Sequence, residues 1–381
     1  ETGPSGAEEM ETTAEPDAGW RVDFSPRGID LDSFPYHVWR KLSRNTLVDD
    51  NKEMFHSGNH QGEPGLREAI RSYLHSARGV NCSPEQIIVG AGSEYLLMLL
   101  SQILEGKHVI AMENPTYKQA YRVFRSLDYE VCPVEMDANG MEPELLTRSG
   151  ANVAYVMPSH QFPTGVVMPV GRRQELLKWA VEAPDRYIIE DDYDSEFRYR
   201  GKPIPALQGM DRSGRVIYLG TFSKCIAPAI RVSYLVLPTH LLLRYRSQTS
   251  FYASTVSRID QNILYQFLAG GYFERHLNRM RAVYKTKHDL LLEQIEPLRE
   301  RFEIRGEHEG IHILLTSRQG ESEEQLIQKA EEAGVKVYGL SSYFIHPQHN
   351  HRPATVVLGY ASLSEEQIVE GIRLLMECWG A

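Results

Sequence analysis

The segment VIYLGTFSK, residues 216–224, runs from an apolar strand pattern into a glycine, two hydroxyl side chains and a lysine. Burial and nearby cations lower the pKa of a lysine at such a strand end, which makes it a nucleophile for Schiff-base chemistry. Thr221 and Ser223 are spaced to reach a phosphate group, and Arg231 downstream adds a fixed positive charge. A lone lysine after a strand is more often a solvated strand end. The hydroxyls and Arg231 near Lys224 favour a functional lysine instead.

Strand and helix patterns alternate on both sides of this segment. Short apolar runs bounded by turn residues predict strands, and apolar residues at helical spacing predict helices between them. Alternation over about 150 residues predicts an α/β fold, with a mostly parallel sheet covered by helices on both faces. In such folds ligands bind at the carboxyl ends of the strands. The predicted strands are residues 87–89, 108–112, 130–134, 153–157, 187–189, 216–219 and 232–237.

The pattern changes after about residue 240, where long charged helical segments begin. The strands predicted beyond them, at 311–316, 335–338 and 355–358, indicate a smaller C-terminal α+β domain. We therefore expect four parts. They are a linker or tail (1–20), an N-terminal segment packing on the small domain (21–50), a large cofactor-binding domain (51–270) and the small C-terminal domain (271–381).

A second segment, YIIEDDYDSEF (187–197), continues an apolar strand into a run of carboxylates. Side chains alternate along a strand, so Asp191 and Tyr193 are expected on one face and Asp192 on the other. A carboxylate at a strand end can pair with a protonated ring nitrogen, and a phenol on the same face can donate to a ring oxygen. A metal-binding cluster and a solvated acidic turn are the alternative interpretations.

Three further segments also follow predicted strands. In IIVGAGSEYLLMLL (87–100) a glycine turn leads into a helix near Ser93, whose backbone N–H groups would bind a phosphate, although a plain tight turn is the alternative. In ENPTYKQAY (113–121) Tyr117 is placed to stack on a flat ring. PSHQFPTG (158–165) is a polar turn. A phosphate site, a stacking aromatic, a ring-nitrogen carboxylate and a nucleophilic lysine together indicate one cofactor, pyridoxal 5′-phosphate (PLP).

Composition excludes several classes of protein. The 381 residues carry 41 Lys and Arg against 51 Asp and Glu, and this net charge of −10 argues against binding DNA or an anionic membrane over the whole surface. No apolar run reaches the roughly 18 residues of a membrane span, and we see no signal peptide. The four cysteines form no CxxC pair, so we expect reduced thiols in a cytoplasmic protein and no metal site.

The spacing of these motifs resembles that of fold-type I aminotransferases over residues 21–381. SHQFPTGVVMP, IEDDYDSEF and GTFSK resemble, more narrowly, the MocR/GabR branch of the GntR superfamily of bacterial transcription regulators. In that family a winged helix-turn-helix domain and a linker precede an aminotransferase-like domain that binds PLP and an effector and forms homodimers. The acidic start, rich in Glu, Thr, Gly and Pro, is similar to such a linker.

The resemblance implies a role for each motif residue. Lys224 would form the internal aldimine, and Asp191 would hold the pyridine nitrogen. Tyr193 would hold the phenolic oxygen, and Tyr117 would stack on the ring. The phosphate would be held by Ser93 and Glu94, through their backbone N–H groups, and by Thr221, Ser223 and Arg231.

The resemblance also concerns the effector. His160 and Gln161 correspond to a turn beside the cofactor, and Arg352 is a candidate contact for an effector carboxylate. Aminotransferases of this fold place an arginine near the C-terminus to bind the substrate carboxylate, but the corresponding stretch TVVLGYASL (355–363) has none.

Two functions remain open at this point. The first is an effector-sensing and dimerisation domain with weak or absent transaminase activity, which exchanges its internal aldimine with a small amine or amino-acid effector. Such a domain would contact DNA only through a separate N-terminal domain. The alternative is a PLP-dependent aminotransferase acting on a small amino acid.

Overall fold

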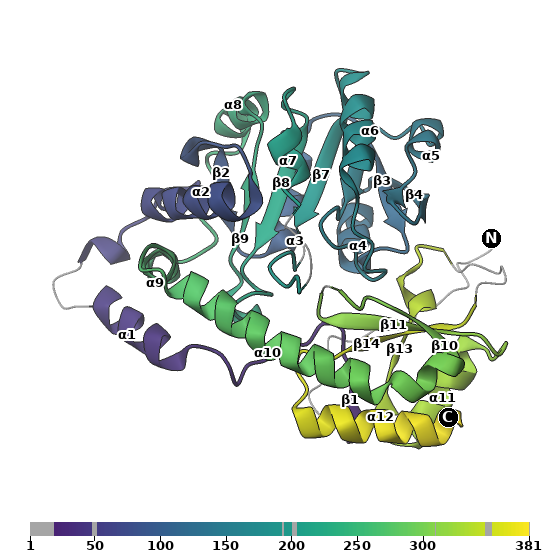
Figure 1. Cartoon of the computed structure of the whole chain (residues 1–381). Helices are drawn as coiled ribbons and strands as arrows, with labels where there is room; N and C mark the ends of the chain where they lie inside the picture. The colour runs from purple at the N-terminus through teal and green to yellow at the C-terminus, as the bar shows by residue number, and fades with distance from the viewer. Residues whose placement is uncertain are drawn as a thin grey trace, which may run out of the picture.

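Two main sheets organise the chain (Figure 1). The computed structural model describes residues 19–47, 52–192, 194–199, 204–308, 310–346 and 353–380. Within these ranges an eight-stranded sheet has the order β2-β9-β8-β7-β6-β3-β4-β5, and a four-stranded sheet has the order β10-β11-β14-β13. A two-stranded pairing joins β1 (Val22–Asp23) to β12 (Val335–Lys336).

The eight-stranded sheet confirms the predicted α/β fold. Its central strands β8, β7, β6, β3 and β4 run parallel, while β9 is antiparallel to both of its neighbours. All seven predicted strands of this sheet are present, and the short hairpin strand β5 is an addition. The bounds are β2 (Ile87–Gly90), β3 (Val109–Asn114), β4 (Glu130–Asp137), β5 (Gly140–Met141), β6 (Val153–Val156), β7 (Tyr187–Asp192), β8 (Val216–Thr221) and β9 (Ser233–Val236).

Helices cover both faces of this sheet, as its apolar strands require. Ile189 of β7 packs in the cluster that contains α3, α4 and α8, and its neighbour Ile188 packs in the cluster that contains α6 and α7. α2 and α9 cover the second face over β2 and β9. The bounds are α2 (Pro64–Arg78), α3 (Ser93–Ile103), α4 (Lys118–Ser126), α5 (Pro143–Arg148), α6 (Val170–Val181), α7 (Leu207–Met210), α8 (Thr239–Gln248) and α9 (Arg258–Ala269).

The smaller sheet packs on two helices, and the long helix α10 connects the two parts of the chain (Figure 1). The strand predicted at 335–338 is wrong as a single element. Lys336 ends β12 beside β1, and the next strand pairs with β14 instead, so the chain changes sheets at Val337. The bounds are α10 (Tyr272–Gln294), β10 (Phe302–Arg305), β11 (His312–Ser317), α11 (Glu323–Glu332), β13 (Tyr338–Gly339), β14 (Thr355–Gly359) and α12 (Glu365–Trp379).

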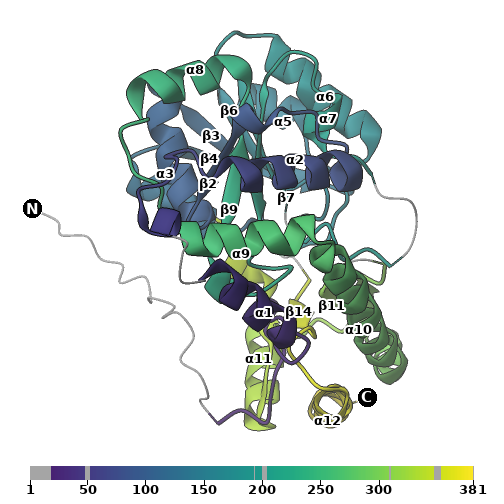
Figure 2. The ribbon, with the colours of Figure 1, turned by 90° about the vertical axis from the view of Figure 1, so that its left-hand side faces the viewer.

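The N-terminal segment contacts both parts. β1 pairs with β12, and α1 (Tyr36–Thr46) lies along α9, where the Trp39 and Phe267 rings are 5.5 Å apart (Figure 2). The segment 21–50, which the sequence predicts to pack on the small domain, thus contacts α9 as well as β12. The predicted linker lies almost entirely outside the described residues. No described helix is long and apolar enough to cross a membrane.

Arg173 of α6 ties the end of β6 to the rest of the sheet. Its side chain is fully buried, and its guanidinium donates hydrogen bonds to the carbonyl oxygens of Met168, Pro205 and Pro158 at 2.9, 2.6 and 2.6 Å. Pro158 begins the polar turn 158–165, so this arginine fixes the backbone from which that turn starts.

We therefore expect Arg173→Leu to lower the free energy of unfolding by about 3 kcal/mol or more, because the carbonyls of the buried residues Met168 and Pro158 and the part-buried Pro205 carbonyl lose their donor. Urea unfolding followed by circular dichroism measures this change. The matched control is Arg148→Leu, since Arg148 is an exposed arginine whose ion pair with Glu144 is 3.7 Å long. The control should unfold like the wild type, and equal loss in both variants would contradict the role of Arg173.

Candidate cofactor and effector site

Asp191 is a buried carboxylate at the carboxyl end of β7. Tyr155 of β6 donates a hydrogen bond to it, on the face that carries α3 and α4. Burial raises the pKa of Asp191 to about 7, and the hydrogen bond from Tyr155 only partly opposes this effect. Within the described ranges no cationic side chain pairs with Asp191, so the site supplies a buried acceptor for a cation from a ligand.

Asp192 points to the opposite face, as alternation along a strand predicts. Arg78 of α2 forms a buried ion pair with it at 2.7 Å, and Tyr218 of β8 donates a further hydrogen bond. Burial alone would raise the pKa of Asp192, but the Arg78 guanidinium holds this pKa below its usual value. Asp192 is therefore a structural carboxylate, whose charge the protein itself compensates.

Lys224 lies in the turn after β8, the strand next to β7. Its Nζ donates a hydrogen bond to the carbonyl oxygen of Arg27 at 3.0 Å. Burial lowers the pKa of Lys224 to about 8, and the Arg27 guanidinium adds to this effect while the Asp194 carboxylate opposes it. More of this amine is thus unprotonated near neutral pH than in an ordinary lysine, and the unprotonated amine is the form that attacks a carbonyl carbon.

The residues predicted to hold a phosphate gather at the start of α3. Arg231, in a left-handed conformation with φ of 51°, places its Nη2 atom 3.0 Å from the Glu94 carboxylate. Gly92 precedes α3 with φ of 95°, and a Cβ atom there would lie 2.4 Å from Arg231 Nη2. Any side chain at Gly92 would therefore fill the space in front of the Arg231 guanidinium and the free N–H groups of α3.

The hydroxyls of the β8 turn lie beside this cradle. Ser233 of β9 donates a hydrogen bond to Thr221 Oγ1 at 2.9 Å, and the Ser223 backbone N–H donates to the same atom at 3.2 Å. Thr221 Oγ1 is thus an oriented acceptor whose own proton is available to an anion. Ser233 in turn pairs with Gly90, just before α3, so Thr221 and Ser223 lie at the end of a strand that is separated from β2 by β9 alone. Ser93, Glu94 and Arg231 lie together at the start of α3.

Tyr117 lies between the two halves of the site. It precedes α4, and its ring packs edge-on against Phe162 with the centroids 6.2 Å apart. Burial raises its pKa to about 12, with further contributions from the charges of Glu94 and Asp191. Tyr117 is thus close enough to both Glu94 and Asp191 for their charges to affect it. This position is consistent with a ring that stacks on a ligand bound between them.

His160 and Gln161 are both buried, but they have different surroundings. The Gln161 side chain donates to the Pro115 carbonyl at 2.9 Å and accepts from the Thr164 N–H at 3.1 Å, so it braces the turn 158–165. His160 Nδ1 lies 2.7 Å from Asp194, whose carboxylate also acts on the pKa of Lys224. His160 is therefore the better placed of the two to influence a ligand at Lys224.

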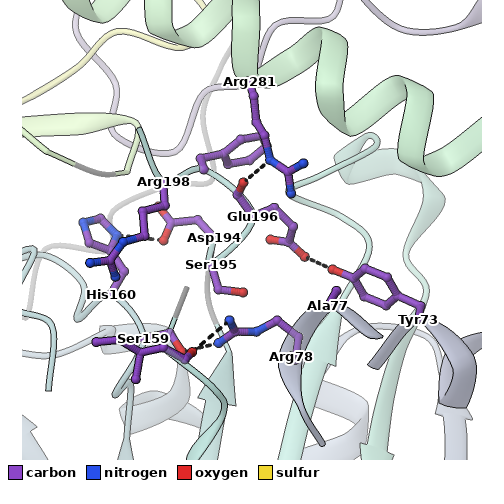
Figure 3. Close-up of a pocket in the computed structure, with 12 residues that line it drawn as sticks. Tyr73, Ala77, Arg78, Ser159, His160, Asp194, Ser195, Glu196, Arg198 and Arg281 are labelled. Atoms are coloured by element: carbon purple, nitrogen blue, oxygen red, sulfur yellow. Dashed lines mark hydrogen bonds and ion pairs between the residues drawn. The ribbon is translucent and has the colours of Figure 1, made fainter. Parts of the chain in front are cut away.

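A polar cavity of about 220 Å³ opens beside the His160–Asp194 pair (Figure 3). Arg78 lies across it from His160 and contacts Ser159 Oγ at 2.5 Å, and Arg281 of α10 donates to the Glu196 carbonyl at 2.8 Å. Because Arg78 forms the ion pair with Asp192, the cavity lies on the face of β7 that carries Asp192. Asp191 and Tyr155, which lie on the opposite face, do not line it.

Two of the predicted site residues, Tyr193 and Arg352, lie outside the described residues. Sequence reasoning missed Tyr155, Arg78 and Arg27. Tyr155 could have been found, because it sits opposite Ile189 in the parallel register of β6 and β7 and so shares a face with Asp191. Arg78 and Arg27 come from distant segments, and no local pattern marks them. Among the described residues no group of three or more His, Cys, Asp or Glu could hold a metal ion.

Comparison with known proteins identifies the class of this chain. The family model for aminotransferase class I and II matches residues 30–374. Among solved structures, the multiple substrate aminotransferase of Thermococcus profundus has a TM-score of 0.84 at 28% identity, covering 95% of this chain and 92% of that one. The kynurenine aminotransferase of Pyrococcus horikoshii has a TM-score of 0.82 at 26% identity, covering 94% and 90%. The chain belongs to the aminotransferase class I and II family.

Regulators are among the most similar curated proteins. The chain is 42% identical over 371 residues to the uncharacterized HTH-type transcriptional regulator YdeL of Bacillus subtilis, covering 97% of this chain and 79% of YdeL. It is 34% identical over 361 residues to the probable rhizopine catabolism regulatory protein MocR of Rhizobium meliloti, covering 93% and 72%. Within the aminotransferase family the chain therefore belongs to the MocR-type transcription regulators, as the motif resemblance predicted.

The residues present fit PLP. The buried Asp191 carboxylate matches a protonated ring nitrogen, the cradle kept open by Gly92 matches a phosphate, and the Lys224 amine matches an aldehyde. These three features lie at the ends of the neighbouring strands β7 and β8 and at the start of α3.

We expect Asp191→Asn to stabilise the cofactor-free chain at high pH. Burial raises the Asp191 pKa from its usual 3.8 to about 7. The folded chain then binds more protons than the unfolded chain between these values, so this group makes stability fall as pH rises through that window. The gain from Asp191→Asn, measured by urea unfolding, should be about 2 kcal/mol larger at about pH 8 than at about pH 5. A gain independent of pH would contradict the raised pKa.

Proposed function

We propose that this chain is the PLP-binding, effector-sensing and dimerisation part of a bacterial transcription regulator. The proposal rests mainly on two features at adjacent strand ends. The Lys224 amine follows β8, and the Asp191 carboxylate, whose pKa burial raises, lies at the end of β7. The similarity to regulators over nearly the whole chain supports the regulatory role. The Pyrococcus horikoshii structure, solved with PMP, supports the cofactor.

When bound, PLP supplies an aldehyde carbon that condenses with a lysine amine and can exchange that amine for the amine of a ligand. Each residue of the site has a task in this chemistry. Lys224 would donate the amine, Asp191 would keep the ring nitrogen protonated, and Tyr117 would stack on the ring. The phosphate would be oriented by the backbone N–H groups of Ser93 and Glu94 and by Thr221, Ser223 and Arg231, and Tyr193 would hold the phenolic oxygen.

The effector we propose is a small amine or amino acid that displaces Lys224. Binding would change contacts between the two parts of the chain, or between two subunits of a homodimer, because Lys224 contacts the N-terminal segment that bridges those parts. DNA would be contacted by a separate N-terminal domain, such as the HTH in the names of the relatives. The four cysteines are all free, which supports a cytoplasmic location.

A PLP-dependent aminotransferase is the second candidate, favoured by the solved enzymes that share the fold. An efficient enzyme holds the substrate carboxylate so that the bond to be broken is perpendicular to the cofactor ring. The stretch 355–363 forms β14 and a buried turn, in which Tyr360 donates a hydrogen bond to the Gly310 carbonyl at 2.7 Å. No guanidinium comes from this stretch, so the sensing role is favoured.

The first test uses the visible absorbance of the PLP-loaded chain. Lys224→Ala should abolish the absorbance band of lysine-linked cofactor, because no other amine is at that position. A retained band would show that another lysine is the anchor.

A second test separates the two carboxylates of β7. Asp191→Ala should weaken PLP binding by about 2 kcal/mol or more, since the ring nitrogen loses its buried partner. Asp192→Ala should leave the affinity of the folded protein much less changed, although it destabilises the fold by leaving Arg78 unpaired. Cofactor titration measures the affinity and urea unfolding the stability. Equal losses of affinity would contradict the assignment of faces.

A third test concerns turnover. The PLP-loaded chain, mixed with a panel of amino acids and an oxo-acid acceptor, should change its absorbance spectrum but form new amino acid slowly or not at all. A misplacement of about 1 Å can cost on the order of 100-fold in rate, and the usual clamp is missing from 355–363. Turnover at about 1 per second or faster, typical of enzymes, would favour the aminotransferase.

A further inference from the structure

The stretch that lacks an arginine, 355–363, is covered by the N-terminal segment. The Gly359 N–H donates to the Phe24 carbonyl at 2.9 Å. A Cβ atom on Gly359 would lie 2.2 Å from the Ser25 carbonyl oxygen, and one on Gly28 would lie 2.3 Å from Ser362 Oγ. The loop 25–28 is therefore in direct backbone contact with the end of β14 and the turn after it.

Two side chains of helix α10 hold the loop 25–30 against the stretch 355–363. Lys287 Nζ lies 3.1 Å from Asp30 Oδ2 and donates to the Ala361 carbonyl at 2.9 Å, and both partners are shielded from solvent. Tyr284 adds a hydrogen bond, accepting the Asp30 N–H at 3.0 Å. One buried cation thus ties the loop 25–30 to the stretch 355–363, so the backbone at the tip of the loop is held in a defined place.

Arg27 is at that tip, over Lys224. Its carbonyl oxygen accepts the hydrogen bond from Lys224 Nζ at 3.0 Å. Its guanidinium acts electrostatically on both Lys224 and Tyr117, the residues proposed to bond with the cofactor and to stack on its ring. Within the described ranges the Arg27 side chain is exposed and makes no hydrogen bond or ion pair.

The other charges around Lys224 are already engaged. Arg231 pairs with Glu94, and Asp194 pairs with His160. Within the described site, the Arg27 guanidinium is therefore free to bind a ligand. Its planar array of N–H donors matches the two oxygens of a carboxylate.

We propose, building on the function proposed above, that Arg27 binds the carboxylate of an amine ligand at Lys224. The N-terminal loop thus supplies the guanidinium that the stretch 355–363 lacks. The ligand class that fits is an amine carrying a carboxylate, which would bridge the Lys224 position and the Arg27 side chain. Arg27 belongs to the N-terminal segment, so such a ligand also connects the cofactor to the segment that would lead to a DNA-binding domain.

The test compares ligands that differ only by a carboxylate. The PLP-loaded chain of 381 residues is titrated with two pairs, alanine with ethylamine and 4-aminobutanoate with propylamine, and the spectral change gives each Kd. The wild type should prefer the carboxylated member of at least one pair. Arg27→Gln should reduce that preference by roughly 10-fold or more, with the Kd of the plain amine unchanged. Arg27→Lys should restore part of it.

The control is Arg40→Gln, since Arg40 is an exposed arginine of α1 in the same segment and should keep the full preference. A merely structural role of Arg27 would change the affinities for both members of a pair equally, which would overturn the proposal. So would an unchanged preference in Arg27→Gln, or a wild type that prefers neither carboxylated ligand. A wild type that does not bind PLP would instead overturn the proposed function, and this inference with it.

Discussion

Two adjacent carboxylates are buried at the end of β7, and each has to be compensated on its own face of the sheet. A buried carboxylate is tolerated only when a cation or several donors accompany it, because desolvation otherwise drives it to bind a proton. The protein compensates Asp192 itself, through Arg78 and Tyr218. Among the described residues, only the Tyr155 hydroxyl donates a side-chain hydrogen bond to Asp191. The protein therefore neutralises the carboxylate on one face with its own arginine, while the carboxylate on the other face has its pKa raised by burial.

This asymmetry explains why the ligand site lies where it does. The face that carries Asp191 is also the face on which α3 begins. We therefore propose that this face binds both the ring nitrogen and the phosphate of one cofactor molecule. Lys224 joins them because β8 is the next parallel strand and ends level with β7. The same neighbourhood lowers the lysine pKa and raises the carboxylate pKa, and both shifts have burial as their main cause.

The sequence was sufficient for the parts of this arrangement that depend on local pattern. The strands from 87–89 to 232–237, the opposite faces of Asp191 and Asp192, and the motif residues around Lys224 follow from periodicity and from position at strand ends. Contacts between distant segments could not be predicted in this way. Arg27 approaches Lys224 from nearly 200 positions away in the chain, and the pair of His160 and Asp194 joins two loops. The prediction of one strand at 335–338 was wrong for the same reason. Residues 335–336 and 338–339 pair with strands of different sheets, and the residue pattern does not show which strand is the partner.

The proposed function requires a covalent link between PLP and one lysine, and that link can be located directly. Borohydride reduction of the PLP-loaded chain fixes the cofactor to its amine, and peptide mass spectrometry then identifies the modified residue. We predict a single phosphopyridoxyl group, on the peptide that contains Lys224. A label on any other lysine, or no label after saturating PLP and reduction, would contradict it.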